Sequence, residues 1–334
     1  MLLEPADLPA TMVLELVREH WDPGVAYAAH LSAGAGAWHW VCAGKHQPRW
    51  FVTADSVTAP GRLEELLDAY ASARVLAERG HHIVVPTVAP TSPTGRSEGI
   101  GVVHGAYLLT MTPYLEGESG PGEYADDGQR TLLAGSLAEL HAEPPPKRTP
   151  AWTPGPPLRS ELSALMNRLD EPWTAGPFAE PTREALRYNA SELKSLYDRF
   201  DGLAAQALVS RASWVVTHGE PHTANVMWLP GGPVLVDWES LRIAPRERDL
   251  RTVLRGAEGA EPLSAYVARG GTADLDADMV ELFDLEWWLW EVANYAVRFH
   301  GPHSGNLDDE RFYSAFLEEV MPAVNAVVTK ETVR

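Results

Sequence analysis

The segment from residue 213 to residue 239, SWVVTHGEPHTANVMWLPGGPVLVDWE, constrains the fold more than any other part of the chain. Three short apolar runs alternate with a polar loop and a Gly-Gly turn, which predicts strand, loop, strand, turn and strand. The turn folds the last two strands into a hairpin, so Asn225 at its start and Asp237 at its end should lie side by side. Because polar loops between buried strands often carry function, we expect a site at this end of the hairpin.

Three side chains of this segment suit a metal-assisted reaction. The carboxamide of Asn225 and the carboxylate of Asp237 are hard oxygen ligands, which suit Mg²⁺ bound by few protein groups together with phosphates. Glu220, five residues before Asn225, can accept a proton from a hydroxyl nucleophile beside such a metal. Singly, Asn225 and Asp237 are better explained as turn residues, and only their joint spacing with Glu220 favours function.

Residues 1–112 combine strand patterns with two helical ones. Residues 11–21 and 62–79 have apolar side chains at helical spacing, and Gly80 ends the second helix. We therefore expect a small antiparallel sheet crossed by one helix. The expected strands are VAYAAHLS (25–32), AWHWVCAG (37–44), RWFVTAD (49–55), IVVP (83–86) and the pair within GVVHGAYLLTM (101–111).

The remainder of the chain is mainly helical in pattern. Residues 113–122, PYLEGESGPG, have turn composition and are expected to link two lobes. The Pro-rich stretch 143–157 cannot form a regular helix and is predicted to be a surface connection. Helices are expected at residues 127–142, 158–170, 181–207, 274–300 and 308–328.

HGEPHTAN followed by LVDWE resembles the catalytic loop and metal-binding Asp of protein-kinase-like phosphotransferases, and most of all those of the aminoglycoside phosphotransferase family. The resemblance implies an α+β, bilobal fold. Its parts would be a small antiparallel β-sheet N-lobe with one crossing helix (1–112), an inter-lobe linker (113–122) and a larger, mainly helical C-lobe (123–334). It also implies Mg²⁺-dependent transfer of the γ-phosphate of ATP or GTP to a hydroxyl of a small molecule.

The resemblance assigns roles within the polar loop and the helix that follows it. Glu220 takes the catalytic-base position, and Asn225 and Asp237 take the metal positions. His218 would anchor the loop, and Asp249 would brace it from the following helix.

The resemblance also places the nucleotide. Gly34 and Gly36 would form the nucleotide-covering turn, and residues 112–115, with Thr112 and Tyr114, would hold the adenine edge through backbone groups. His39 and Thr53 are assigned to the same site.

Two positions differ from the family pattern. The base position holds Glu220 instead of Asp, which retains a carboxylate. Thr53 stands where the third strand normally carries a Lys that pairs with the nucleotide phosphates and with a helix Glu, here Glu64 or Glu65. Lys45 is predicted to lie in the preceding turn, so His39, Arg49 or a backbone cradle would have to replace the missing charge. A binding protein on a degenerate kinase scaffold, with weak or no catalysis, is therefore the alternative.

A third class, a metal-dependent hydrolase, would use His218, His222 and Asp237 as zinc ligands. The helical zinc motif requires H-E-x-x-H, whereas this loop reads H-G-E-P-H and Pro221 disrupts a helix. His222 alone is explained as a hydrogen-bonded loop residue, although we also assign it to the substrate side.

The substrate side is expected on the long helix near the end of the chain. Asp284, Trp287, Trp288 and Glu291 recur at helical spacing, and such an acidic and aromatic stripe can bind an amino sugar through ion pairs and CH–π contacts. Core packing explains the tryptophans as well. Glu239, next to the metal-binding segment, is also assigned to the substrate.

The formal charge of −19 is unevenly distributed. Residues 116–127 hold five acids and no base, and residues 258–291 hold nine acids and one base. Together they carry −13 of the total. This distribution fits attraction of a cationic substrate, and it also fits solubility.

Composition limits the partners and the cellular location that we expect for this protein. The acid excess argues against nucleic acids and anionic membranes as partners, because both require a basic surface. No run of 18 apolar residues and no signal-peptide pattern is present, so we expect a cytoplasmic protein without a membrane span. A single cysteine, Cys42, excludes an intramolecular disulfide and multi-cysteine metal sites. We expect a monomer or a homodimer.

Overall fold

A computed structural model describes residues 1–34, 36–45, 47–92, 97, 99–120, 122, 124, 126–156 and 158–332, with side chains up to residue 326. The chain forms two compact units. The first unit comprises Met1–Trp152 and Ser213–Leu275, and the second comprises Thr153–Ala212 and Asp276–Arg334. The functional lobes expected at 1–112 and 123–334 stay a prediction.

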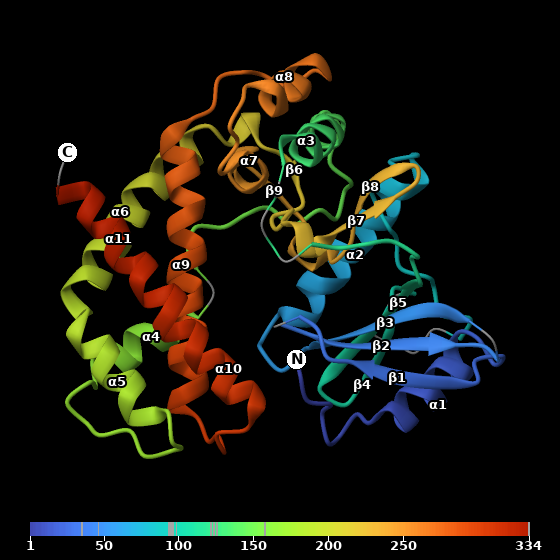
Figure 1. The fold of residues 1–334 in the computed structure, drawn as a ribbon, viewed down its shortest axis with the longest axis horizontal. Helices are drawn as coiled ribbons and strands as arrows, with labels where there is room; N and C mark the ends of the chain where they lie inside the picture. Colours follow the sequence, from blue (N-terminus) through green and yellow to red (C-terminus); the bar gives the residue numbers. More distant parts are fainter. Residues whose placement is uncertain are drawn as a thin grey trace. The chain divides into compact units, whose positions relative to one another are not determined.

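The first unit is built on a five-stranded antiparallel sheet with the order β1-β2-β3-β5-β4 (Figure 1). The strands expected at residues 25–32, 37–44, 49–55 and 101–111 are all present. Their bounds are β1 Tyr27–Leu31, β2 Trp38–Ala43, β3 Pro48–Ser56, β4 Val102–His104 and β5 Tyr107–Pro113.

The two faces of this sheet have different neighbours. Trp40, Val52 and Met111 point to one face, where they pack against helix α1 (Ala10–His20) in a common apolar core. Because side chains alternate along a strand, Thr53 and Asp55 lie on the opposite face. That face also carries Leu108, which packs with helix α2 (Arg62–Glu78).

Helix α2 is the single crossing helix expected from the sequence. It starts after Gly61, whose φ of 78° lies in the left-handed region, and it carries Glu64 and Glu65 in its first turn, where acids favour the positive end of the helix dipole. Gly80, with φ of 94°, follows its end. Its buried stripe, including Leu66, Tyr70 and Leu76, joins the larger core of the first unit.

The strand, loop, strand, turn and strand pattern expected at residues 213–239 is also confirmed. β6 (Val215–Thr217) precedes the polar loop, and β7 (Val226–Leu229) and β8 (Gly232–Leu235) form the hairpin. β9 (Arg242–Ala244) then pairs with β6. Helix α3 (Asp127–His141) packs against α7 (Glu247–Leu254) and α8 (Glu261–Ala268), two helices that the sequence patterns did not identify.

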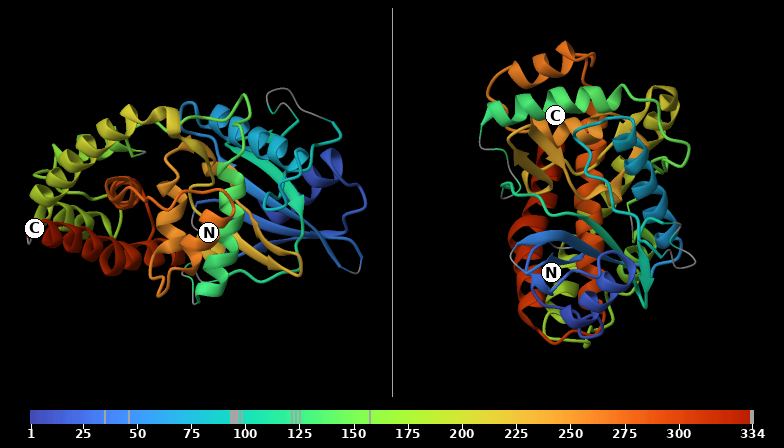
Figure 2. Two further views of the ribbon diagram at one scale, coloured as in Figure 1. Left: turned by 90° about the horizontal axis from the view of Figure 1, so that it is seen from above. Right: turned by 90° about the vertical axis from the view of Figure 1, so that its right-hand side faces the viewer.

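The second unit is helical, with α6 and α11 both packed against the long helix α9 (Figure 2). Its helices are α4 Arg159–Met166, α5 Ala179–Tyr188, α6 Ala190–Val209, α9 Ala277–His300, α10 Leu307–Ala315 and α11 Met321–Thr332. Residues 316–320 continue from α10 into α11 as a π-helical turn. Phe299 and Phe316 are buried among these helices.

Several expected elements differ in extent. The helix expected at 181–207 is two helices, because Asn189 leaves helical geometry and its side chain donates to Ala185 O at 2.8 Å. The helix expected at 158–170 ends at Met166, and the one expected at 308–328 is interrupted by the π-helical turn.

The strand expected at 83–86 is wrong. Val84 makes only an isolated bridge to Leu235, and Pro86 has no N–H with which to extend a ladder.

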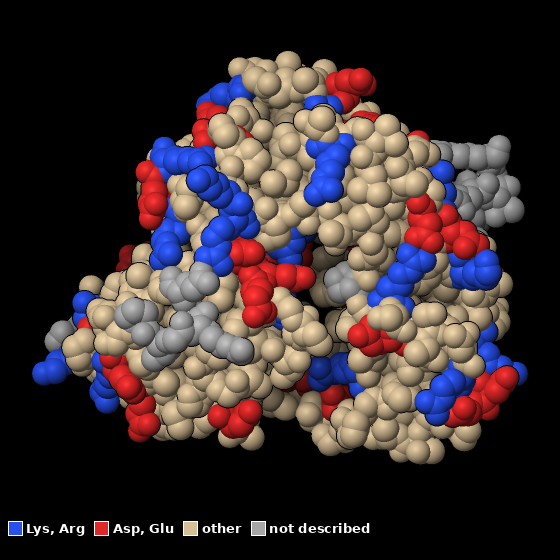
Figure 3. Space-filling view, turned by 180° about the vertical axis from the view of Figure 1, so that it is seen from behind, with Lys and Arg blue, Asp and Glu red and all other residues tan. Residues whose placement is uncertain are grey.

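In the part of the chain that the structure describes, no helix is both long enough and apolar enough to cross a membrane. Figure 3 shows one face of the molecule, on which acidic and basic side chains are interspersed.

Candidate functional site

The polar loop is held by a buried carboxylate from another element. Asp249, in α7, is fully buried and accepts hydrogen bonds from the backbone N–H groups of His218 (2.9 Å) and Gly219 (2.6 Å). His141 of α3 also binds this carboxylate, at 3.1 Å, and its other ring nitrogen contacts the hydroxyl of Tyr266 at 2.8 Å. Burial by itself would raise the pKa of Asp249, but the hydrogen bond and charge of His141 outweigh burial, so this pKa is lowered. The bracing role predicted for Asp249 therefore has a geometric basis.

His218 is a neutral structural anchor. Its Nε2 donates to Val236 O (2.8 Å) and its Nδ1 accepts from Glu220 N (3.3 Å), which fixes the tautomer. Burial lowers the pKa of His218 to about 4. Both ring nitrogens are thus engaged, and neither is left to bind zinc, which argues against the hydrolase alternative. By linking Glu220 to Val236, the ring ties the loop to the end of the hairpin.

Gly219 is required by the local backbone. Its φ of +102° lies in a region that L side chains rarely adopt. A Cβ atom there would lie 2.3 Å from Nη1 of Arg248. That guanidinium donates to Thr217 Oγ1 (3.1 Å) and Ser240 O (2.9 Å), so it cannot move without losing both bonds.

Glu220 and Asn225 lie within one hydrogen-bonded group. Ser240 Oγ donates to Glu220 Oε1 at 2.9 Å, and Asn225 Nδ2 donates to Glu220 O at 3.1 Å. His222 Nε2 lies 4.0 Å from Glu220 Oε2. The side-chain nitrogen of Asn225 is therefore directed at the loop, which leaves the side-chain oxygen, Oδ1, available to a cation.

The hairpin brings Asp237 next to Asn225, as the sequence predicts. Val236 N donates to Asn225 O at 3.0 Å, so Asp237 directly follows a residue bonded to Asn225. The backbone of Asp237 is left-handed (φ 64°, ψ 65°), which Asp and Asn tolerate better than other side chains that bear a Cβ. This conformation redirects the chain where β8 ends.

Asp237 lies within reach of the negative charges of other carboxyl groups. Surrounding protein atoms raise the pKa of Asp237 well above its usual value even though the residue is exposed, and the charges of Glu239, Asp55 and Glu220 raise it further. Burial likewise raises the pKa of Glu239. Burial and the charge of Glu239 raise the pKa of Asp55 to about 7. This excess of negative charge favours binding of a cation.

The raised pKa of Asp55 predicts a pH-dependent stability. The folded protein keeps a proton on this buried carboxyl that the unfolded chain releases near pH 4, so the free energy of unfolding should fall as pH rises from about 4 to about 7. Asp55→Asn should be less sensitive to pH over this range, because the amide oxygen still accepts from Tyr70 (3.0 Å to Asp55) without a charge. Urea unfolding at several pH values checks this. Asp170→Asn, at an exposed position, is the control, and an unchanged pH slope in Asp55→Asn would contradict the assignment.

Three residues predicted for the nucleotide lie together at one end of the sheet. Gly34 has φ of +72°, and a Cβ there would lie 3.0 Å from Nε2 of His39. Nδ1 of His39 is 3.2 Å from Thr53 Oγ1, and its ring stacks on Phe51. Burial lowers the pKa of His39 to about 4, so the ring is uncharged and cannot replace the missing Lys as a cation. Gly36 lies in the same turn, with open space around it.

Thr112 and Tyr114 lie at the other end of β5, where Tyr114 N donates to Arg49 O at 3.0 Å. The segment that follows runs along the β7–β8 hairpin, because Trp228 N donates to Glu118 O at 3.0 Å. Gly120 N and Gly122 N then donate to Thr223 of the polar loop, at 2.9 and 2.8 Å. The predicted linker thus contacts the candidate site through backbone groups.

The residues predicted for the substrate are divided between the two units. His222 and Glu239 lie in the first unit with the polar loop. Asp284, Trp287, Trp288 and Glu291 are half-buried along α9 in the second. The ring of Trp287 contacts Trp290 at 5.3 Å, and Glu291 is hydrogen-bonded to Tyr295. These contacts lie within the helix, and the substrate role of the stripe stays a prediction.

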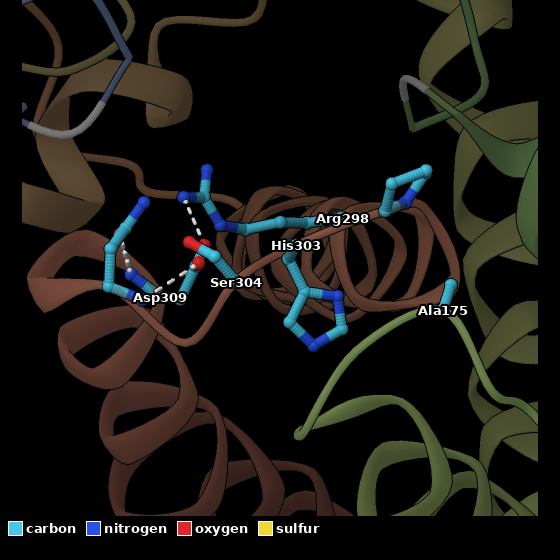
Figure 4. A pocket seen from close by; sticks show the side chains of 7 residues that line it. Ala175, Arg298, His303, Ser304 and Asp309 are labelled. Atoms are coloured by element: carbon cyan, nitrogen blue, oxygen red, sulfur yellow. Dashed lines mark hydrogen bonds and ion pairs between the residues drawn. The ribbon is translucent and has the colours of Figure 1, made fainter.

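A cavity of about 600 Å³ in the second unit is lined by polar side chains that form structural contacts (Figure 4). Arg298 pairs with Asp309 at 2.8 Å, and Asp309 caps α10. His303 accepts from Phe178 N (3.0 Å) and lies 2.9 Å from Gly301 O. We therefore place the candidate site at the polar loop of the first unit.

The sheet order, the crossing helix, the braced loop and the hairpin ending in Asp237 together define a protein-kinase-like fold. The chain belongs to the phosphotransferase enzyme family, whose model matches residues 39–282. This confirms both the resemblance and the fold class that the sequence predicted.

Known proteins extend the comparison. Protein StrN from Streptomyces griseus is 27% identical over 337 residues, covering 94% of each chain. Spectinomycin phosphotransferase, solved with ADP and spectinomycin, has a TM-score of 0.73 at 16% identity and covers 95% of this chain and 98% of its own. Choline kinase from Cryptosporidium parvum has a TM-score of 0.54 at 10% identity, covering 96% and 97%. The two solved structures show a shared fold.

Sequence reasoning missed several residues at the site. Asp55 on β3 contacts Tyr70 on α2, and Arg62 at the start of α2 pairs with Glu239. These residues come from three separate segments, so no local motif marks them. Among the described residues, no three His, Cys, Asp or Glu side chains converge as a ready-made metal site.

Proposed function

We propose that this protein transfers the γ-phosphate of ATP or GTP to a hydroxyl of a small, cationic molecule. The observation that carries the proposal is the placement of the Glu220 loop beside Asn225 and Asp237, braced by the buried Asp249. Catalysis of this kind consists mainly of positioning and charge neutralisation. A rigid loop beside two metal-suited side chains supports it.

Glu220 is the proposed base. The hydrogen bond from Ser240 orients its carboxylate. The ring of His222 lies 4.0 Å from the same carboxylate, which is too far for a hydrogen bond. In this role Glu220 would accept the proton of the substrate hydroxyl, a contribution of roughly 10²–10⁴ in rate. His218 remains neutral and positions Glu220 by accepting a hydrogen bond from the backbone N–H of Glu220.

Asn225 and Asp237 are the proposed holders of Mg²⁺. Their oxygens are the kind that Mg²⁺ prefers, and the negative charges of Glu239, Asp55 and Glu220, which add to the effect of burial on the pKa of Asp237, favour a cation there. When bound, the ion would supply neutralisation of phosphate charge. Asn225 is kept in place by its bond to Glu220 O.

The substrate class is inferred from charge and from relatives. The acidic segments 116–127 and 258–291 would favour a cationic molecule by long-range attraction. Neighbours in fold include a spectinomycin phosphotransferase, a protein solved with GDP and kanamycin, and a choline kinase; spectinomycin, kanamycin and choline are all hydroxylated amines. An aminoglycoside-like antibiotic or an amino alcohol is therefore the proposed acceptor.

A coupled assay of nucleoside diphosphate release tests this proposal. The wild-type protein is given ATP or GTP with Mg²⁺ and a panel of aminoglycosides, aminocyclitols and amino alcohols, with neutral sugars for comparison. We expect release that depends on an amine from this panel. Release with no member of the panel, although nucleotide binds, would contradict the proposed activity.

A binding protein without catalysis is the second candidate, and Thr53 in the Lys position favours it. Thermal unfolding with millimolar ATP or GTP and Mg²⁺ separates the two. A ligand bound only by the native state raises the melting temperature, and we expect a shift of several degrees. No shift would support the degenerate scaffold.

A further inference from the structure

Among the residues that the structure describes, the nucleotide side of the first unit contains few candidates for a cation that could bind phosphates. His39 is uncharged, because burial lowers its pKa. Arg49 is paired with Asp22 at 3.1 Å. Lys45 lies in the turn between β2 and β3, at the end of β2 opposite to Gly34. The described arginines Arg18, Arg74 and Arg79 donate to the backbone carbonyls of Val25, Gly99 and Pro144.

Arg62 differs from all of these in its surroundings. It is the first residue of α2, and its guanidinium pairs with Glu239, two residues after Asp237. Helix α2 also packs against the turn Trp238–Ser240, which carries Glu239 and directly follows Asp237. Arg62 therefore lies within electrostatic reach of the proposed metal position.

The resemblance predicts a basic side chain on β3 and an acidic one on α2, but the structure has the acid on the strand and the base on the helix. The strand contributes an acid, Asp55, whose carboxyl accepts a hydrogen bond from Tyr70 of α2 at 3.0 Å. The helix contributes the base, Arg62. Asp55 shares a sheet face with Thr53 and lies at the same end of the sheet as the Gly34 turn, so this part of α2 lies near the end of the sheet where the nucleotide-covering turn is predicted.

We propose that Arg62 is the phosphate-binding cation of the nucleotide site, in place of the absent strand Lys, and that Glu239 holds it there before nucleotide binds. This inference rests on the proposed function, because it concerns the same nucleotide site. A triphosphate brings more negative charge than one Mg²⁺ neutralises, and the carboxyl groups around Asp237 add to it. A guanidinium suits phosphate because it offers several donors in a fixed plane.

Binding of nucleosides and nucleotides to Arg62→Gln tests this inference. Calorimetric titrations measure the Kd of ATP and GTP with Mg²⁺, and of adenosine and guanosine, which have no phosphates. We expect Arg62→Gln to weaken triphosphate binding by about 10- to 100-fold and to leave nucleoside binding unchanged. Arg79→Gln, at the far end of the same helix, is the matched control and should bind both as the wild type does.

The outcomes separate this inference from the proposed function. If the wild type binds neither triphosphate, the proposed function fails and this inference fails with it. If the wild type binds one and Arg62→Gln binds it equally well, only this inference is overturned. An equal loss of nucleoside and triphosphate affinity would also overturn it, because that result indicates a structural role.

Glu239→Gln provides a second test that keeps Arg62 intact, should Arg62→Gln not fold. The amide oxygen can still accept from Arg62 but no longer neutralises it. We expect triphosphate to bind several-fold more tightly than in the wild type, with nucleoside binding unchanged. Glu65→Gln, which alters the other acid near Arg62, at 3.7 Å, should have a smaller effect because Glu65 is exposed. Weaker triphosphate binding in Glu239→Gln would overturn the inference.

Discussion

Asp237→Asn should lose at least about 10³-fold in kcat/KM for Mg²⁺-dependent phosphate transfer, equivalent to about 4 kcal/mol of transition-state stabilisation. The reason is that the change removes the charged oxygen proposed to hold the metal. The fold should persist, because Asn also tolerates the left-handed backbone at this position. Stability near neutral pH should be unchanged or higher, since the native environment raises the pKa of Asp237 and so disfavours its charge.

Steady-state kinetics with varied Mg²⁺, together with thermal unfolding, check this result. Asp198→Asn makes the same chemical change on the exposed surface of α6 and should keep full activity. Wild-type activity in Asp237→Asn would remove the basis for the metal assignment. Asp237→Ala should also be inactive, but its loss would be harder to interpret because Ala is strained in the left-handed region.

Gly219→Ala should abolish most activity and destabilise the protein by about 1–3 kcal/mol. A side chain at φ of +102° is strained, and its Cβ would collide with the guanidinium of Arg248. Displacing Arg248 breaks its bonds to Thr217 and Ser240, and Ser240 is the residue that orients Glu220. The effect therefore reaches the proposed base without touching it directly.

Denaturant unfolding and kinetics of the same preparation measure both effects. Gly202→Ala is the matched control, because this glycine lies inside α6, where a Cβ would meet no atom within 4 Å. That variant should be more stable by about 0.5–1 kcal/mol, since Ala loses less backbone entropy in a helix. Unchanged stability and activity in Gly219→Ala would show that the loop does not depend on this backbone conformation.

The patterns that predicted structure well were local. Alternating and helical spacing located β1, β2, β3 and α2, because burying one face of a strand or helix fixes a short repeat. The sequence patterns did not locate α7 or α8, because each is only eight residues long and gives little periodic signal, and a helix at Asp249 was expected only from the resemblance. The break at Asn189 was also missed, since it depends on one side chain that bonds to the preceding turn.

At the candidate site, the sequence alone determined the polar loop, the hairpin and the spacing of Glu220, Asn225 and Asp237, because all three lie on one continuous segment. The resemblance implied that Asp249 braces that loop, but only the tertiary structure showed that His141 holds the Asp249 carboxylate and that Asp55 and Arg62 approach Asp237. These partners are brought together by the packing of α2, α3 and α7 around the loop. These residues lie far apart in the sequence and meet only in the folded chain, so no local motif could have revealed their contacts.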